Sequence, residues 1–325
     1  VQLITGVAVY GGYAGYGEPD ANARDVREFE TVLSGDLRGN DFAEALPLQY
    51  ATERTRAENS CNVVTSSGTD ETAVLDGFTI TAGQADSGGK YGTGGGMNNG
   101  GGDPTLANCT FTRNWASSMG GAIRSESGSN LVAVKCRFTG NAADSSGGAV
   151  SNYYMGTAEF INCSFTGNIS FSGRGGAIHT RNTVTLINCT LSGNSAEKGG
   201  GIIVGREPST LTNCIFWGNS DSGGTGESAQ IYDSKDTSAV NSCCVQGWSG
   251  DLGGVGNTGG DPLLADADGA DNLFGTIDDN PRLLPGSACS NAGDNAAVPG
   301  GLTGDLDGNP RMIDRIVDMG AYEGA

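Results

Sequence analysis

The feature that most constrains this chain is a phrase that recurs along its middle. Residues 162–180 read NCSFTGNISFSGRGGAIHT, and similar stretches stand at 135–150 (KCRFTGNAADSSGGAV) and at 188–203 (NCTLSGNSAEKGGGII). Equivalent positions follow one another at intervals of 25 to 31 residues. Self-similarity at such a period is typical of repeat architectures, in which each unit buries its apolar face against the next. The drifting interval favours coils joined by loops of variable length over helical pairs of fixed period.

The repeat contains a strand with one buried face. An apolar position recurs in each unit and is mostly cysteine: Phe78, Cys109, Cys136, Cys163, Cys189, Cys214 and Cys243. Two residues later comes a second apolar column: Ile80, Phe111, Phe138, Phe165, Leu191, Phe216 and Val245. Residues at i and i+2 share one face of a strand, and those between them are mainly polar. The pattern therefore predicts a half-buried strand in every unit.

Two further columns mark turns and a second strand. Asparagine recurs three residues after the second apolar column: Asn114, Asn141, Asn168, Asn194 and Asn219. Asparagine tolerates left-handed backbone, and its amide can bond to the next amide in a stack. Gly-Gly then precedes an apolar position, which is Met97, Ile123, Val150, Ile178 and Ile202, with Ile231 as a less clear member. Two strands and a weaker third per ~27 residues predict a solenoid whose coils stack at about 4.8 Å.

The motifs that carry these columns resemble a known family. GGAI at 120–123 and 175–178, GGAV at 147–150, and FTRN, FTGN, FTGN and FWGN resemble the GGA(I/L/V) and FxxN tetrapeptides of polymorphic outer-membrane protein repeats. AVYGGYAG near the start, DLDGNPR from Asp305 and DMGAYE from Asp318 resemble bacterial surface proteins of the pectate-lyase-like β-helix class. The resemblance implies an all-β, right-handed parallel β-helix that is exported and displayed at the cell surface or released.

The same resemblance and the composition divide the chain. We expect the β-helix over residues 1–249, with the clearest repeats in 74–247, and an Asp-rich closing segment over 250–325 that continues the coils as a cap. Members of the family usually carry further coils before AVYGGYAG and an anchor after DMGAYE, and this chain shows neither. It begins at Val1 without a leader, which fits an exported, processed protein or a fragment boundary equally well.

Charge excludes some partners. The chain has 18 Lys and Arg against 37 Asp and Glu, a net charge of −19, which is the wrong sign for binding a phosphate backbone. No apolar stretch approaches the ~20 residues that a membrane-spanning helix needs. We therefore expect neither a nucleic-acid partner nor a membrane span.

The spacing of the cysteines predicts a stacked column of side chains and does not favour a framework of disulfides. Neighbours in an in-register parallel stack present their Cβ atoms side by side, which suits a disulfide torsion of about 90° poorly. We expect the column to consist of reduced, buried thiols that pack as small apolar residues. Cys61, Cys244 and Cys289 lie outside this pattern and are better candidates for bridges.

The acidic end suggests calcium. Between Asp261 and Ala325 there are 12 acidic residues against three arginines, a net of 3 − 12 = −9. A structural calcium site is expected in one loop from Asp266, Asp268, Asp271, Asp278 and Asp279, and a weaker one from Asp305, Asp307 and Asn309. A solvated acidic loop that serves only solubility is the alternative for these residues.

The repeat faces lack the carboxylates of a polysaccharide-cleaving enzyme. The outward positions of the cysteine strand are Thr110, Arg137, Ser164, Thr190 and Ile215, followed by Thr112, Thr139, Thr166, Ser192 and Trp217. The single histidine, His179, is expected to be a solvated surface residue. Acids of the first 60 residues keep an enzyme open as an alternative: Asp25, Glu28, Glu30, Asp36, Asp41 and Glu44. Aromatic residues that could meet a sugar or a protein partner are Tyr153, Tyr154, Trp217 and Tyr232.

Our first expectation for function is a non-enzymatic extracellular protein that assembles head-to-tail into a fibre or surface layer. Open β-helix ends expose unpaired N–H and C=O groups, which a second copy can satisfy. The alternatives are a cell-surface adhesin that binds a glycan or a protein, and a polysaccharide lyase or hydrolase. No catalytic residue and no cofactor other than calcium is expected.

Overall fold

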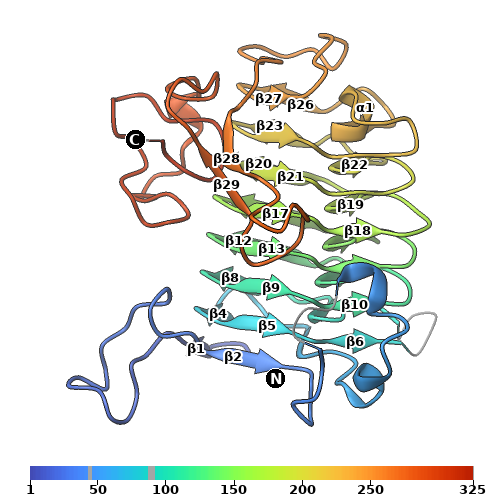
Figure 1. The fold of residues 1–325 in the computed structure, drawn as a ribbon, viewed down its shortest axis with the longest axis vertical. Coiled ribbons are helices and arrows are strands. Elements are labelled where there is room, and N and C mark those ends of the chain that lie inside the picture. Colours follow the sequence, from blue (N-terminus) through green and yellow to red (C-terminus); the bar gives the residue numbers. More distant parts are fainter. Residues whose placement is uncertain (43–45, 87–91, 325) are drawn as a thin grey trace.

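The chain winds into a stack of coils (Figure 1). The computed structural model describes residues 1–42, 46–86 and 92–324. Strands at equivalent places in successive coils pair in parallel, which gives three long sheets and one short sheet along the stack. Among the described residues, helix occurs only in segments of three to five residues. This all-β parallel solenoid confirms the fold expected from the repeat.

The sheets are named S1 to S4 here. Sheet S1 contains β1 (Ala8–Tyr10), β4 (Val74–Asp76), β8 (Thr105–Ala107), β12 (Asn130–Val134), β16 (Thr157–Ile161), β20 (Val184–Ile187), β23 (Thr210–Thr212) and β26 (Ala239–Asn241). Sheet S2 contains β2 (Val32–Ser34), β5 (Thr79–Thr81), β9 (Thr110–Thr112), β13 (Arg137–Thr139), β17 (Ser164–Thr166), β21 (Thr190–Ser192), β24 (Ile215–Trp217) and β27 (Cys244–Val245).

Sheets S3 and S4 complete each coil. Sheet S3 contains β3 (Val64–Ser67), β7 (Met97–Gly100), β11 (Ile123–Glu126), β15 (Val150–Asn152), β19 (Ile178–Thr180), β22 (Ile202–Val204) and β25 (Ile231–Asp233). The short sheet S4 contains β6 (Gln84–Ala85), β10 (Trp115–Ala116), β14 (Ala142–Ala143) and β18 (Ile169–Ser170). The helical turns are η1 (Pro47–Gln49), η2 (Arg54–Glu58), α1 (Glu227–Gln230) and η4 (Asn295–Ala297).

The core consists of stacked columns of like residues. Phe138 pairs in register with Phe111 on one side and Phe165 on the other. The rings of Phe138 and Phe165 stack with centroids 4.5 Å apart and an interplanar angle of 5°. The six cysteines of the column are also buried, and each strand of S2 begins one residue after its cysteine. The residue before several of these cysteines has a positive φ, as at Asn162 (51°), so a left-handed corner separates S1 from S2.

The asparagine column forms a hydrogen-bonded ladder inside the turn that follows S2. Asn141 Nδ2 donates to Asn168 Oδ1 over 3.0 Å, and Asn168 Nδ2 donates to Asn194 Oδ1 over 2.9 Å. The same Nδ2 of Asn168 also reaches Phe138 O at 2.8 Å in the preceding coil. These side chains are fully buried, so the ladder satisfies backbone groups that water cannot reach.

Segments outside the coils cover one side and the last coil. Residues 47–59 pack on S4, where Tyr50 joins a buried cluster with Trp115 and the Arg56 guanidinium lies 4.6 Å from the Tyr50 ring centroid. After the last coil, residues 246–258 fold over it: Val245 N donates to Thr258 O over 2.9 Å, and Trp248 packs against the main core. The last rung of S2 therefore already has a partner.

The closing segment turns away from the helix axis. Strands β28 (Leu264–Asp266) and β29 (Asn280–Leu283) pair antiparallel with each other and with no strand of the coils among the described residues. Residues 261–324, called the C-terminal segment below, fold back along the outer face of S2 (Figure 1). Asn162 Nδ2 donates to Gly304 O over 2.8 Å, and Ala321 N donates to Thr190 Oγ1 over 3.0 Å. This arrangement differs from the continuation of the coils that we expected, because residues 246–258 occupy the place of a further coil.

Candidate ligand-binding groove

A row of hydroxyl groups runs along the outer face of S2. Strands β5, β9, β13 and β17 are in register, so their outward side chains stack from coil to coil. The hydroxyl groups belong to Thr79, Thr81, Thr110, Thr112, Thr139, Ser164 and Thr166, and Arg137 stands among them. Thr139 Oγ1 and Thr166 Oγ1 lie 3.2 Å apart. The period of the row is the strand spacing of about 4.8 Å, which follows directly from the solenoid.

Two segments far apart in the sequence wall this row into a groove. Residues from 24–31 and from the C-terminal segment both line it, and the two segments meet where Arg27 Nη1 donates to the backbone oxygen of Asp307. The groove holds two adjoining cavities of about 630 Å³ and 910 Å³, called the basic cavity and the acidic cavity here. Residues shared by both linings are Glu30, Thr79, Thr110, Arg137 and Arg282. The groove is therefore continuous across several coils.

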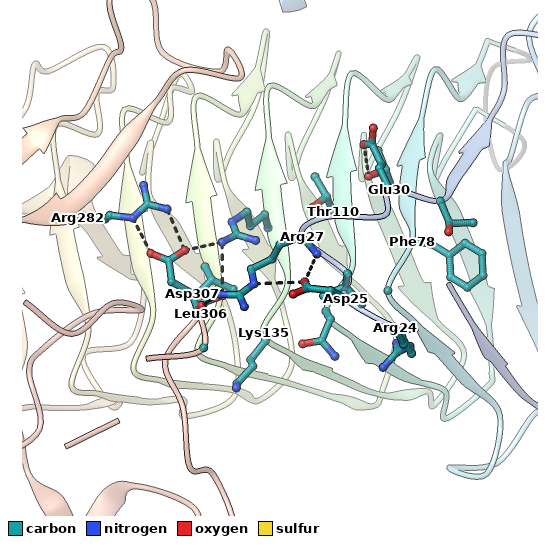
Figure 2. A pocket seen from close by; sticks show the side chains of 17 residues that line it. Arg24, Asp25, Arg27, Glu30, Phe78, Thr110, Lys135, Arg282, Leu306 and Asp307 are labelled. Carbon is teal, nitrogen blue, oxygen red and sulfur yellow. Dashed lines mark hydrogen bonds and ion pairs between the residues drawn. The ribbon is translucent and has the colours of Figure 1, made fainter. Parts of the chain in front are cut away.

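The basic cavity gathers positive charge around Asp307 (Figure 2). The Asp307 carboxylate accepts from Arg137 Nη2 at 3.0 Å and from Arg282 Nε and Nη2 at 2.6 and 2.9 Å. Arg27 Nη1 donates to the backbone oxygen of Asp307. The bond to Asp307 raises the pKa of Arg282 above its usual value, so this guanidinium stays charged.

The charge balance of this cavity is opposite to that of the chain. Its lining contains five cationic residues against three acidic ones, whereas the chain as a whole carries −19. The cationic residues are Arg24, Arg27, Lys135, Arg137 and Arg282. Arg24 is paired with Asp76 at 2.9 Å, and Lys135 is half-buried at the cavity wall. An anion in this cavity would meet a local excess of positive charge.

The acidic cavity brings three of the predicted calcium ligands onto the same face. Thr276 Oγ1 lies 2.6 Å from Asp278 Oδ1 and 3.4 Å from both Asp271 Oδ1 and Asp279 Oδ1. Burial raises the pKa of Asp279 to about 7, despite hydrogen bonds from the Gly275 and Thr276 backbone that lower it. Tyr50 and Tyr322 complete the lining together with the exposed side chains of Leu273 and Ile277.

The other predicted ligands lie apart from this cluster. Asp266 pairs in register with Asn280 at the end of β28, and Asp268 lies in the turn that follows. Asp305 is buried, and its Oδ1 accepts from the backbone N–H groups of Asp307 and Asn309 at 2.9 and 2.8 Å. In the parts of the chain that the structure describes, no three His, Cys, Asp or Glu side chains gather in a way that could hold a metal ion. Calcium binding stays a prediction.

The histidine prediction was wrong. His179 is 5% exposed, and burial lowers its pKa to about 4, with Arg181, Arg124 and Arg174 contributing through charge repulsion. The Tyr153 ring lies beside it, with the two ring centroids 6.1 Å apart, and the Arg124 and Arg181 guanidiniums lie 5.0 and 4.4 Å from the Tyr153 ring centroid. A neutral histidine inside this cationic cluster is a packing residue of the outer face of S3.

The four aromatic residues that the sequence suggested for ligand contact differ in how exposed they are. Tyr154 is exposed, and Tyr232 lies under Lys198, whose Nζ is 4.0 Å from the ring centroid. Trp217 packs against the buried cluster that contains Met319 of the C-terminal segment. None of the four lines either cavity.

Sequence reasoning missed the groove. Its lining contains Asp25 and Glu30 from the early acids, whereas Asp41 pairs with Arg56 at 3.4 Å and Glu44 lies outside the described residues. The outward positions of S2 from Thr110 to Trp217 carry no carboxylate, whereas strands of the other sheets do, as at Asp76, Glu126 and Glu159. The structure supplies the groove with carboxylates from the C-terminal segment, which no period connects to S2. Arg137, the single cation in its outward column, was the one available signal.

Comparison with known proteins supports the repeat. The Chlamydia polymorphic membrane protein repeat matches residues 108–126 and 162–181. These stretches run from β9 to β11 and from β17 to β19, the part of a coil that carries the phenylalanine, asparagine and Gly-Gly columns. The match confirms the resemblance seen in the motifs. No curated protein and no solved structure gave a match. Fold and repeat together indicate a surface-associated β-helical protein.

Proposed function

We propose that this surface-associated β-helical protein is an adhesin-type binding module, and that its groove holds an acidic glycan. The observation that carries the proposal is the cluster of five cationic side chains in a groove of a chain whose net charge is −19. Guanidinium groups bind carboxylates and sulfates through paired hydrogen bonds, and the hydroxyl row beside them matches the polar edge of a sugar.

Groove shape also favours a chain-like ligand. The row of Thr and Ser side chains repeats with the coils at about 4.8 Å, so equivalent donors meet successive units of an extended polymer. The two cavities adjoin at Thr79, Thr110 and Arg137, which lie in successive coils of S2. A small ligand would use one cavity, whereas a polysaccharide can occupy both.

Titration of the full chain with an acidic polysaccharide tests this proposal. Polygalacturonate and heparin serve as probes, and neutral dextran serves as the control. We expect Lys135→Ala to weaken binding about fivefold, or ~1 kcal/mol, and added salt to weaken it further. Lys235→Ala, at an exposed position away from the groove, is the matched control. Equal binding of dextran and polygalacturonate, or no binding of either acidic probe, would reject the proposal.

A polysaccharide lyase or hydrolase is the second candidate, and one observation favours it. Asp279 has a pKa of about 7 and lies beside Asp278 in the acidic cavity, so one carboxyl is able to hold a proton near neutral pH while another is charged. Paired carboxyls of this kind perform acid and base steps in glycoside cleavage. Release of reducing ends or of unsaturated sugars from bound polysaccharide, lost in Asp279→Asn, would support an enzyme.

The head-to-tail fibre stays a prediction with less geometric support. Strands β1, β2 and β3 are the outermost strands of S1, S2 and S3 at one end of the stack. At the other end, residues 246–258 cover the last coil. A growing filament needs two open ends, so residues 246–258 would have to move. Electron microscopy of the chain with calcium and with a chelator tests both assembly and a role for calcium.

No helix among the described residues is long and apolar enough to cross a membrane. Display at a cell surface is part of the proposal. Fractionation of the source cells, with protease added to intact cells, is the experiment for it.

A further inference from the structure

Two buried thiols meet where the C-terminal segment rests on the last coil. Cys244 is the first residue of β27, and Cys289 belongs to the C-terminal segment. Both are fully buried and share one apolar cluster with Ile215, Leu283 and Met319. Interaction with the Cys289 thiol is the largest cause that raises the pKa of Cys244. Two cysteines that are 289 − 244 = 45 residues apart are thus brought side by side.

This pair differs from the cysteine column. Column neighbours are successive rungs of a parallel stack, so their Cβ atoms are held about as far apart as the strands, ~4.8 Å, beyond the ~3.8 Å of a disulfide. Donation to a backbone carbonyl is common to both places, as from Cys163 Sγ to Ala133 O at 3.4 Å and from Cys244 Sγ to Gly260 O at 3.1 Å. Cys289 instead approaches Cys244 from outside the sheet, and no ladder fixes the spacing of the two Cβ atoms.

The backbone around Cys289 is held firmly in place. Cys289 N donates to Ser287 Oγ over 3.0 Å, and Cys289 O accepts from Met319 N over 3.0 Å. The Cys244 thiol lies 3.1 Å from the backbone oxygen of Gly260, the residue directly before the C-terminal segment. The two thiols therefore stay together whenever this segment is docked.

We propose that Cys244 and Cys289 form a disulfide that fastens the C-terminal segment to the last coil. The oxidant is a small-molecule disulfide such as oxidised glutathione. One cysteine thiolate attacks a sulfur of the oxidant, which forms a mixed disulfide and releases one glutathione thiolate. The second cysteine thiolate then attacks the cysteine sulfur of that mixed disulfide and releases the second glutathione. Two electrons pass from the cysteine pair to the oxidant, and the two thiol protons end on glutathione.

Oxidation is expected while the segment is open, because both thiols are shielded once it is docked. The full chain is therefore refolded in a glutathione redox buffer and, in parallel, in excess dithiothreitol. Each sample is denatured, alkylated and digested without reduction for mass spectrometry. We expect a linked pair of peptides that contain Cys244 and Cys289, lighter by two hydrogen atoms than the separate peptides, in the redox buffer alone. The column cysteines should be alkylated in both samples.

Variants and hydrogen exchange separate the link from general oxidation. Cys244→Ser and Cys289→Ser should each abolish the linked peptides, whereas Cys61→Ser, at an exposed position, should leave them intact. Peptides of residues 261–324 should exchange several-fold more slowly in the oxidised wild type than in either serine variant. Full alkylation of Cys244 and Cys289 after oxidative refolding, or a link from either one to another cysteine, would overturn the proposal.

Discussion

The coils and the C-terminal segment are held together by different kinds of contact. In the coils, each buried residue meets its own equivalent in the next coil, as Phe138 meets Phe165 and Asn141 meets Asn168. In the C-terminal segment each contact is unique, whether polar, as between Asp307 and Arg137, or apolar, as in the cluster of Met319 with Ile215. The coils therefore spread their stability over many equivalent contacts, whereas the segment depends on a few. The segment should loosen without unfolding the coils, while damage to a column should unfold both.

The largest expected effect comes from a charge in the phenylalanine column. Phe165 is fully buried between Phe138 and Phe160, so Phe165→Asp places an unpaired carboxyl in the core. We expect destabilisation of more than about 4 kcal/mol, or failure to fold. Circular dichroism melting measures it, with Phe42→Asp at an exposed position as the control. An unchanged melting curve for Phe165→Asp would contradict the stacked core.

Breaking the asparagine ladder should have the next largest effect. Asn168 Oδ1 accepts from both the backbone N and the Nδ2 of Asn141 at 3.0 Å, and Asn168→Ala leaves these buried donors without a partner. We expect a loss of about 2–4 kcal/mol in the free energy of unfolding. Denaturant titration measures it, and the exposed Asn22→Ala should stay within ~0.5 kcal/mol of the wild type. If Asn168→Ala and Asn22→Ala have the same free energy of unfolding, the ladder does not stabilise the fold.

A smaller and local effect is expected at Asp307. Asp307→Asn removes the negative charge that pairs with both Arg137 and Arg282. Because these ion pairs are partly exposed, we expect the free energy of unfolding to fall by about 1 kcal/mol or less. The coils should melt as in the wild type, while residues 261–324 should be cleaved faster by protease. If the coils and residues 261–324 of this variant unfold together in one transition, the two regions form one cooperative folding unit.

A further effect, confined to one loop, concerns pH. The pKa of Asp279 is about 7 in the folded chain against 3.8 for the free side chain, so the protonated form favours the docked loop. Its contribution is complete below pH ~3.8 and is lost as pH rises through about 7. Hydrogen exchange of residues 264–283, corrected for the intrinsic rate, should speed up over this window.

The Asp279 prediction has a matched pair of variants. Asp279→Asn should remove the pH dependence, because the amide does not titrate. Asp266→Asn, at an exposed position outside the cavity lining, should retain it. A pH profile that stays the same in Asp279→Asn would assign the effect to another group.

The stack of coils was predictable because the same spacing of apolar, asparagine and glycine positions recurs in successive coils. The column that contains Cys163 has seven members, and the column that contains Asn168 has five. Because the members agree with one another, they identify the inward-facing and turn positions even where a single repeat departs from the pattern. His179 shows the limit of this reasoning. Its outward position on β19 follows from the alternation, but its burial depends on Tyr153 from the preceding coil, and on the arginines that flank that ring.

The groove was not predictable for a related reason. Arg137 and Asp307 are 170 residues apart, and Asn162 and Gly304 are 142 apart. A single sequence carries no periodic signal that relates such positions. The acids of the closing segment were visible as a cluster, but the face of the solenoid that they approach depends on how the chain folds back after residue 260.

The folded-back segment also bears on how this protein can evolve. Its contacts fall on successive coils: Asp294 meets Asn213, Ala321 meets Thr190, Gly304 meets Asn162, and Asp307 meets Arg137. A bare solenoid gains or loses a repeat by gene duplication or deletion at little cost, because each coil contacts only its neighbours. Here an inserted coil would shift the later contacts by about 4.8 Å relative to the earlier ones. Insertion or deletion of a coil between Arg137 and Asn213 would therefore break contacts of the C-terminal segment, so the number of coils in this region should be conserved during evolution.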